Sequence, residues 1–147
     1  MTTLFPAILF DGIVAELKQE EGFRSHAYQD SLGNWSVAFG RCIQKSIGLG
    51  ISESEAVVLL ENDVLRSIEE VRRAFSWFDT LSATRQSVLV QLCFQLGLPK
   101  LNSFKRMLAA LGSENPDYDL AAVELLDSRY ARQVPMRAER LAEKLRD

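Results

Sequence analysis

The segment from Glu21 to Arg41 constrains the fold more than any other part of the chain. The residues before it carry apolar side chains at helical spacing, and this pattern ends at Gly22, a residue type that often follows the last turn of a helix. Two short runs of strand-favouring residues then flank a turn at 31–34 that contains Gly33. The sequence therefore predicts a helix that leads directly into a small antiparallel hairpin.

Glu21 occupies an unusual position for an acid, because it falls in the last turn of the predicted helix. The helix dipole places partial negative charge there, which disfavours a carboxylate. Combined with partial burial, the dipole would favour the protonated carboxyl near neutral pH, the state that a general acid requires. The alternative is that Glu20 and Glu21 belong to a solvated helix face, and Glu21 alone does not decide between the two.

Asp30 and Ser36 follow in the predicted hairpin, Asp30 where the first strand enters the turn and Ser36 on the returning strand. A tight hairpin would bring Ser36 across from Asp30. Two carboxylates and a hydroxyl suffice to hydrolyse a glycosidic bond. One protonated acid serves the leaving oxygen, while an ionised carboxylate holds a water on the opposite face of the sugar. As a single residue, Asp30 is also typical of an Asp that caps a turn.

Four short motifs lie close together in this region: EGFR at 21–24, AYQD at 27–30, GNWSV at 33–37 and FG at 39–40. Three more follow at SESEA 52–56, CFQLG 93–97 and PMRAER 135–140. Together they resemble, in the same order and over most of the chain, the phage-type (T4-like) lysozymes and endolysins of glycoside hydrolase family 24. The resemblance rests on several separated motifs rather than on one.

The resemblance implies a mainly helical α+β fold with two lobes, formed by residues 1–147 as a single lysozyme-like catalytic domain. We expect a small β-hairpin lobe at about 22–50 and a long linking helix at about 52–73. The helical lobe is expected at about 75–147, together with the N-terminal helix.

The family also implies an activity: inverting hydrolysis of the β-1,4 bond between N-acetylmuramic acid and N-acetylglucosamine in bacterial peptidoglycan, which lyses the host cell. Glu21 would protonate the leaving oxygen, Asp30 would activate water, and Ser36 would help to hold that water. No cofactor or metal is required for this chemistry.

Three further residues are candidates for substrate binding by the same resemblance: Tyr28, Gln95 and Arg137. Gln95 would hydrogen-bond an N-acetyl group, and Arg137 would lie against Glu21 across the two lobes. Without the resemblance, Gln95 would be an ordinary amide on a helix surface, and Arg137 would belong to a solvated cationic face.

The chain departs from the family pattern at three hairpin positions. Ser36 stands where Thr is usual, Ala38 where Gly is usual, and Arg41 where His is usual. We hypothesise that Arg41 pairs with Asp63 on the next helix. These departures also suit a second interpretation, a lysozyme-like glycan-binding or virion module that has lost catalysis, although all three chemical groups are still present.

Size and charge limit the other function classes. The chain has 147 residues, 47% of them hydrophobic, and a formal net charge of −3. This length suits one core rather than two independent domains, and we expect a monomer. The negative net charge and the absence of a dense basic stripe argue against a helical adaptor or nucleic-acid binder. Basic residues are in excess only in 81–147, so that part is the better contact for an anionic glycan.

The start of the chain, Met1-Thr2-Thr3-Leu4, has no basic segment before apolar residues, and Asp11 interrupts the apolar run early. We therefore expect no export signal, and no segment reaches transmembrane length. The expected location is the host cytoplasm, with action on the periplasmic cell wall after the membrane is permeabilised. In the family a holin provides that permeabilisation, so dependence on a holin is implied by the resemblance.

The thiols and the histidine offer little further chemistry. Cys42 and Cys93 lie far apart without metal-ligand spacing, and we expect both to be reduced, with Cys93 in the core. His26 is the sole histidine and is expected at the surface of the first strand, so a zinc site or a Ser-His-Asp triad has almost no residues to draw on.

Helix signals recur after the hairpin. Ser52 and Glu55 form a capping box, Ser82 precedes a pattern that ends at Gly97, and Ser103 is expected to cap a short helix that Gly112 stops. Further helices are expected at 118–126 and after Pro135. The aromatic cluster Phe75, Trp77 and Phe78 is either a sugar platform or, more typically at this density, part of the core.

Overall fold

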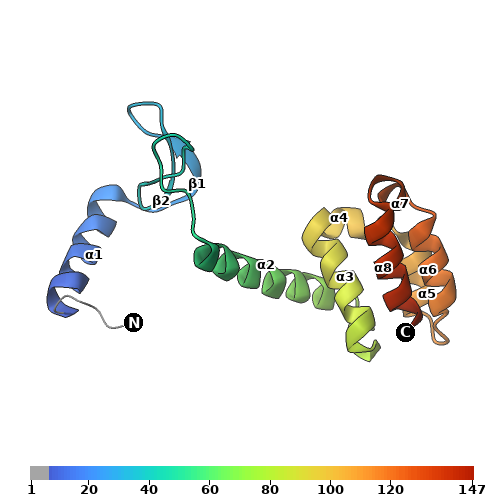
Figure 1. The fold of residues 1–147 in the computed structure, drawn as a ribbon. Coiled ribbons are helices and arrows are strands. Elements are labelled where there is room, and N and C mark those ends of the chain that lie inside the picture. The colour runs from blue at the N-terminus through green and yellow to red at the C-terminus, as the bar shows by residue number, and fades with distance from the viewer. Residues whose placement is uncertain (1–6) are drawn as a thin grey trace. The chain divides into compact units, whose positions relative to one another are not determined.

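The computed structural model describes residues 7–147 of the chain, which forms two compact units, the first ending at Ala56 and the second running Val57–Asp147 (Figure 1). Helices dominate, and one small antiparallel sheet accompanies them. The predicted mainly helical α+β class is therefore confirmed. Residues 1–4, on which the expectation of no export signal depends, lie outside the described residues. No helix in the described part of the chain has both the length and the apolar character needed to cross a membrane.

The first unit contains one helix and three strands, α1 (Ala7–Glu21), β1 (Arg24–Gln29), β2 (Trp35–Ala38) and β3 (Arg41–Cys42). The strands form an antiparallel sheet in the order β1-β2-β3. Gly22 follows α1 with φ 68°, and its N–H donates to the Lys18 carbonyl at 3.1 Å. Because that positive φ favours glycine, the predicted helix end at Gly22 has a direct physical basis.

Helix α2 (Glu53–Ala74) begins in the first unit and continues into the second. Its start is the predicted capping box: the Glu55 N–H donates to Ser52 Oγ at 3.3 Å, and the Ser52 N–H donates to Glu55 Oε2 at 2.8 Å. These two bonds satisfy backbone donors that a helix start leaves free. The predicted linking helix at about 52–73 thus agrees with the observed bounds.

The second unit is built from short helices around one core (Figure 1). In chain order they are η1 (Phe78–Thr80), α3 (Ala83–Leu96), α4 (Leu98–Leu101), α5 (Lys105–Gly112), α6 (Tyr118–Leu126), α7 (Arg129–Gln133) and α8 (Pro135–Arg146). The side chains of Ser82, Asp117 and Ser128 accept hydrogen bonds at the starts of α3, α6 and α7. Helix α6 packs against both α5 and α8.

The aromatic cluster after α2 belongs to the core. Phe78 is buried, and Phe75 and Trp77 stack with ring centroids 5.1 Å apart while packing against the core of the second unit. Trp77 also lies on Gly112: a Cβ on that glycine would come within 2.6 Å of Trp77 Cε2. Of the two alternatives, the core interpretation is therefore confirmed.

Two details of the second unit differ from the sequence predictions. Helices α4 and α7 were not predicted, because four or five residues are too few to show a helical period. Ser103 does not cap α5, since its hydroxyl donates to the Lys100 carbonyl at 2.6 Å and so closes the preceding helix α4. The residue before α5 is Phe104, which makes no side-chain cap.

Candidate active site

Glu21 ends α1, and its carboxyl group lies directly against the turn between β2 and β3. A Cβ built on Gly40 would come 2.5 Å from Glu21 Oε2 and 2.9 Å from its Cδ. Gly40 also has φ 74°, so this position favours glycine for two independent reasons. The Glu21 side chain is exposed. The partial burial predicted for this acid is therefore not present within the first unit.

The turn that meets Glu21 is held against the end of α1 by Phe39. The Phe39 ring lies 5.6 Å from the Phe23 ring, and Lys18 Nζ of α1 lies 6.0 Å from the Phe39 ring centroid. Aromatic pairs at this distance add to the energy gained from burial alone. These contacts keep the Phe39–Gly40 turn near the end of α1, where Gly40 lies against the Glu21 carboxyl.

Asp30 is fixed by the turn that follows it. Its Oδ1 accepts the backbone N–H groups of Leu32 and Asn34, both at 2.9 Å, and its Oδ2 accepts a longer bond of 3.4 Å from Asn34 Nδ2. The bond from the Asn34 backbone is the main cause that lowers the pKa of Asp30 below its usual 3.8. Asp30 thus caps its turn, as one interpretation predicted, and is held as the carboxylate that the other requires.

Ser36 lies on β2, but its partner in the sheet is not the predicted one. Ser36 pairs with Tyr28 rather than with Asp30. The reason is the turn: the Asp30 N–H donates to the Asn34 carbonyl at 2.9 Å, so Asp30 faces Asn34, two residues before Ser36 on the returning strand. Ser36 is 3% exposed. Tyr28, half-buried opposite it, has the Arg24 guanidinium 5.1 Å from its ring centroid.

Arg41 does not pair with Asp63, so that hypothesis is wrong. Its Nη1 lies 2.6 Å from Glu55 Oε2, whereas Asp63 Oδ1 accepts from Arg66 one turn along α2, at 2.9 Å. The capping box holds the Glu55 carboxylate at the very start of α2, next to the loop that follows β3. His26, in contrast, is exposed as predicted and contacts Ser25 Oγ through Nδ1 at 2.9 Å.

Ala38, one of the three departures from the family pattern, adopts φ 59°. This left-handed conformation costs an L-residue with a Cβ about 1–2 kcal/mol. The observed backbone explains why glycine suits this position, and the chain retains the conformation in spite of the side chain.

The second unit holds the other two predicted binding residues, Gln95 and Arg137. Gln95 Oε1 accepts a hydrogen bond from the Tyr130 hydroxyl at 2.9 Å. Burial raises the pKa of Tyr130, while the positive charges of Arg137 and Arg140 act in the opposite direction. Tyr130 therefore orients Gln95 by this hydrogen bond. Tyr130 is not among the residues predicted from the sequence. Its place at the start of a helix that Ser128 caps was the only local signal for it.

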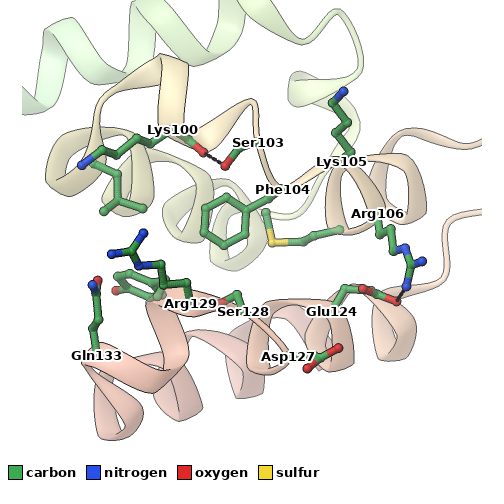
Figure 2. A pocket seen from close by; sticks show the side chains of 13 residues that line it. Lys100, Ser103, Phe104, Lys105, Arg106, Glu124, Asp127, Ser128, Arg129 and Gln133 are labelled. Atoms are coloured by element: carbon green, nitrogen blue, oxygen red, sulfur yellow. Dashed lines mark hydrogen bonds and ion pairs between the residues drawn. The ribbon is translucent and has the colours of Figure 1, made fainter.

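A cavity of about 690 Å³ opens beside Tyr130 (Figure 2). Basic side chains outnumber acidic ones in its wall, with Lys100, Lys105, Arg106 and Arg129 against Glu124 and Asp127. In Figure 2, Lys100 and Arg129 lie at one end of the cavity, and Arg106 and Glu124, whose closest charged atoms are 3.9 Å apart, lie at the other. Such a cavity suits anionic groups.

The first unit contains both of the predicted acids, Glu21 at the end of α1 and Asp30 after β1. Within residues 7–147, no group of three or more His, Cys, Asp and Glu side chains is arranged to hold a metal ion. Cys93 is buried, and burial together with the nearby Glu70 carboxylate raises its pKa to about 11. A thiol with this pKa is a poor nucleophile at neutral pH.

Comparison with known proteins identifies the family of this chain. The family model described as phage lysozyme matches residues 18–141, which include the helix end, the whole sheet and nearly all of the second unit. The chain belongs to the phage lysozyme family.

Two curated relatives of this phage lysozyme family member come from Dictyostelium discoideum. The one named "Probable T4-type lysozyme 2" is 27% identical over 85% of this chain and 88% of its own length. The one named "Probable T4-type lysozyme 1" is 24% identical over the same shares. The predicted family is thus confirmed, and it places the chain among lysozymes, which are glycoside hydrolases.

Proposed function

We propose that this protein is a muramidase that hydrolyses the β-1,4 bond between N-acetylmuramic acid and N-acetylglucosamine in bacterial peptidoglycan. The observation that carries the proposal is the pair of acids in the first unit. Glu21 lies against Gly40, and Asp30 is held by the turn after β1, in a chain of the phage lysozyme family.

In the proposed mechanism, Glu21 donates its proton to the glycosidic oxygen as the bond to the anomeric carbon breaks. Asp30 accepts a proton from a water that attacks the same carbon from the opposite face. The lowered pKa of Asp30 keeps this carboxyl ionised at neutral pH, which is the state that a general base requires. Asp30 Oδ2, which carries only the 3.4 Å bond from Asn34, is the oxygen we assign to the water.

The remaining candidates have supporting roles in this proposal. Ser36 would help to hold the attacking water, and Tyr28, its partner across the sheet, would contact the sugar. Gln95, oriented by Tyr130, would bind an N-acetyl group, and Arg137 would contribute to substrate binding. No cofactor enters the reaction, because the two acids supply both proton transfers.

The cationic cavity of the second unit gives the polymer a second point of contact. We assign its basic side chains to the anionic groups of the wall, in line with the excess of basic residues in 81–147. Binding through exposed cations weakens as salt is added. The affinity for purified walls should therefore fall with ionic strength, and it should fall less in Lys100→Ala and Arg129→Ala variants.

The test of the proposal is clearing of purified peptidoglycan and of permeabilised Gram-negative cells. Glu21→Gln should reduce the rate about a thousandfold, the scale of a lost general acid. Glu20→Gln, on the neighbouring exposed acid of the same helix, is the matched control and should retain the wild-type rate. Equal rates for wild type and a folded Glu21→Gln protein would overturn the assignment of the acid.

The same experiment separates the enzyme from a glycan-binding module. An enzyme releases new reducing ends from the wall, whereas a binding module sediments with the wall and releases none. Proton NMR of the freshly formed reducing end tests inversion: the α-anomer should appear first, because a water-mediated single displacement inverts the β-linkage.

We further propose that the protein acts as an endolysin, made as a monomer in the host cytoplasm and reaching the periplasmic wall only after a holin permeabilises the membrane. Expression in Gram-negative cells should then leave the culture intact until chloroform or a co-expressed holin is added. Spontaneous lysis without permeabilisation would contradict this route but not the muramidase activity itself.

A further inference from the structure

Arg41 connects the end of the sheet to the start of α2. Its Nη1 donates to Glu55 Oε2 at 2.6 Å and to the Gly50 carbonyl at 3.4 Å. The same Glu55 oxygen accepts the backbone N–H of Ser52 at 2.8 Å and the Ser52 hydroxyl at 3.1 Å. One carboxylate oxygen therefore ties β3, through Arg41, to the capping box of α2.

The turn directly before the strand that Arg41 anchors borders the acid. Gly40, whose Cα faces the Glu21 carboxyl, directly precedes Arg41 in the chain. Arg41 pairs with Val37, and Cys42 pairs with Ser36. Any displacement of Arg41 would therefore move both the surface against which Glu21 rests and the strand that carries Ser36.

The strength of the Arg41 pair matters less than its geometry. The two side chains are 38% and 42% exposed, and ion pairs at such positions add little to the stability of a protein. A guanidinium nevertheless fixes direction well, because its planar donors bond at defined angles. Strand β3 is only two residues long, so its ladder bonds alone hold it weakly in place.

We propose that Arg41, through Glu55, is a positioning residue for Glu21. It holds the Phe39–Gly40 turn at the distance where the turn contacts the Glu21 carboxyl and so sets the position of the acid. This inference rests on the proposed muramidase function of Glu21. It assigns a role in catalysis to the position where the family usually has His and this chain has Arg.

Steady-state kinetics on a soluble peptidoglycan fragment test the proposal. Arg41→Ala should lower kcat about tenfold and leave KM within twofold, because misplacing a reacting group affects the chemical step more than substrate binding. Arg41→Lys should recover part of kcat, since it restores the charge without the fixed fork. If Arg41→Ala changes KM alone, or leaves kcat unchanged, the proposal is overturned.

Glu55→Gln completes a double-mutant cycle. Gln also serves in a capping box, so this variant removes the charge that pairs with Arg41 while keeping the helix start. Glu55→Gln and the double variant with Arg41→Ala should show similar losses of kcat, because both break the same link. Losses that multiply would overturn the proposal. Arg66→Ala, which breaks the exposed pair with Asp63, is the matched control and should leave kcat unchanged.

NMR separates failure of this inference from failure of the proposed function. The Gly40 amide and the Glu21 side-chain carboxyl carbon should both shift in Arg41→Ala and stay unchanged in Arg66→Ala. If the wild type hydrolyses no peptidoglycan, the proposed function fails, and these shifts still decide whether Arg41 positions Glu21. Unshifted resonances in a folded Arg41→Ala protein would overturn the inference even if the enzyme is active.

Discussion

Asn34 binds the Asp30 carboxylate twice, through its backbone N–H at 2.9 Å to Oδ1 and through its side-chain amide at 3.4 Å to Oδ2. These bonds favour the ionised acid and lower its pKa in the folded protein below 3.8. Ionised Asp30 therefore stabilises the fold above pH 3.8, and this contribution is lost as the pH falls through the lowered value.

We predict that Asp30→Asn is less stable than wild type at pH 7 and that the difference shrinks as the pH falls below 3.8, the pKa of the carboxyl in the unfolded chain. The amide oxygen of Asn still accepts the two backbone bonds, so only the contribution of the charge is removed. Urea unfolding at a series of pH values measures it. Asn34→Ala, which keeps the backbone donor, should show the same trend with a smaller difference. A difference that does not change with pH would contradict the prediction.

Ala38 provides a test of backbone strain. At φ 59°, replacement by glycine relieves a cost of about 1–2 kcal/mol, and the greater freedom of glycine in the unfolded chain cancels part of that gain. We expect Ala38→Gly to stabilise the first unit by about 0.5–1 kcal/mol, measured by chemical denaturation.

An alanine-to-glycine substitution in a regular helix should have the opposite effect on stability. Ala109 is exposed within α5, where glycine costs about 1 kcal/mol relative to alanine. Ala109→Gly is therefore the matched control, and it should destabilise the protein. If Ala38→Gly also destabilises the protein, strain at position 38 is not significant.

Gly40 should matter for activity beyond its effect on stability. A methyl group there would collide with the Glu21 carboxyl, and the flexible end of that side chain would move away. We predict that Gly40→Ala lowers kcat of the proposed muramidase at least tenfold, the scale expected for a misplaced catalytic group. The rate should be measured on protein shown to be folded by circular dichroism.

A second substitution separates the two effects of Gly40→Ala. Adding Ala38→Gly should restore stability, because it relieves strain in the same turn. It should not restore kcat, because the new methyl group still displaces Glu21. Recovery of kcat together with stability would show that Gly40 acts only through the fold.

Local signals explain which parts of the structure were predictable. Gly22 ends α1, the pair Ser52 and Glu55 starts α2, and α6 spans the predicted 118–126, because each feature depends on residues within one turn of the chain. The candidate acid Glu21 was placed correctly at a helix end for the same reason.

The wrong predictions concern the partners of Ser36 and Arg41, which depend on how the loops between the elements run. The partner of Ser36 depends on where the Asp30 turn closes, and an Asp in a turn is compatible with more than one loop length. The partner of Arg41 depends on the loop after β3, which returns so that the Leu49 N–H donates to the Cys42 carbonyl at 3.0 Å. Helical spacing along α2 does not show that Glu55, rather than Asp63, lies nearest to the strand.

Arg85 offers the last test, because it joins the start of α3 to the end of α8. Its Nε donates to the Leu145 carbonyl at 2.8 Å and its Nη2 to the Arg146 carbonyl at 3.3 Å. Its guanidinium also lies 3.5 Å from the Tyr118 ring centroid. The last carbonyls of a helix have no partners within the helix and favour a cation, so Arg85 supplies what the end of α8 requires.

We predict that Arg85→Ala destabilises the second unit by about 2 kcal/mol, the sum expected for charged hydrogen bonds and a cation–π contact. The stability of Arg85→Lys should lie between those of wild type and Arg85→Ala, because lysine keeps the charge and loses the planar guanidinium. Arg132→Ala, which removes an exposed cation from α7, is the control and should change stability by less than about 0.5 kcal/mol. Equal unfolding midpoints for Arg85→Ala and Arg132→Ala would mean that the end of α8 is stabilised by its apolar face alone.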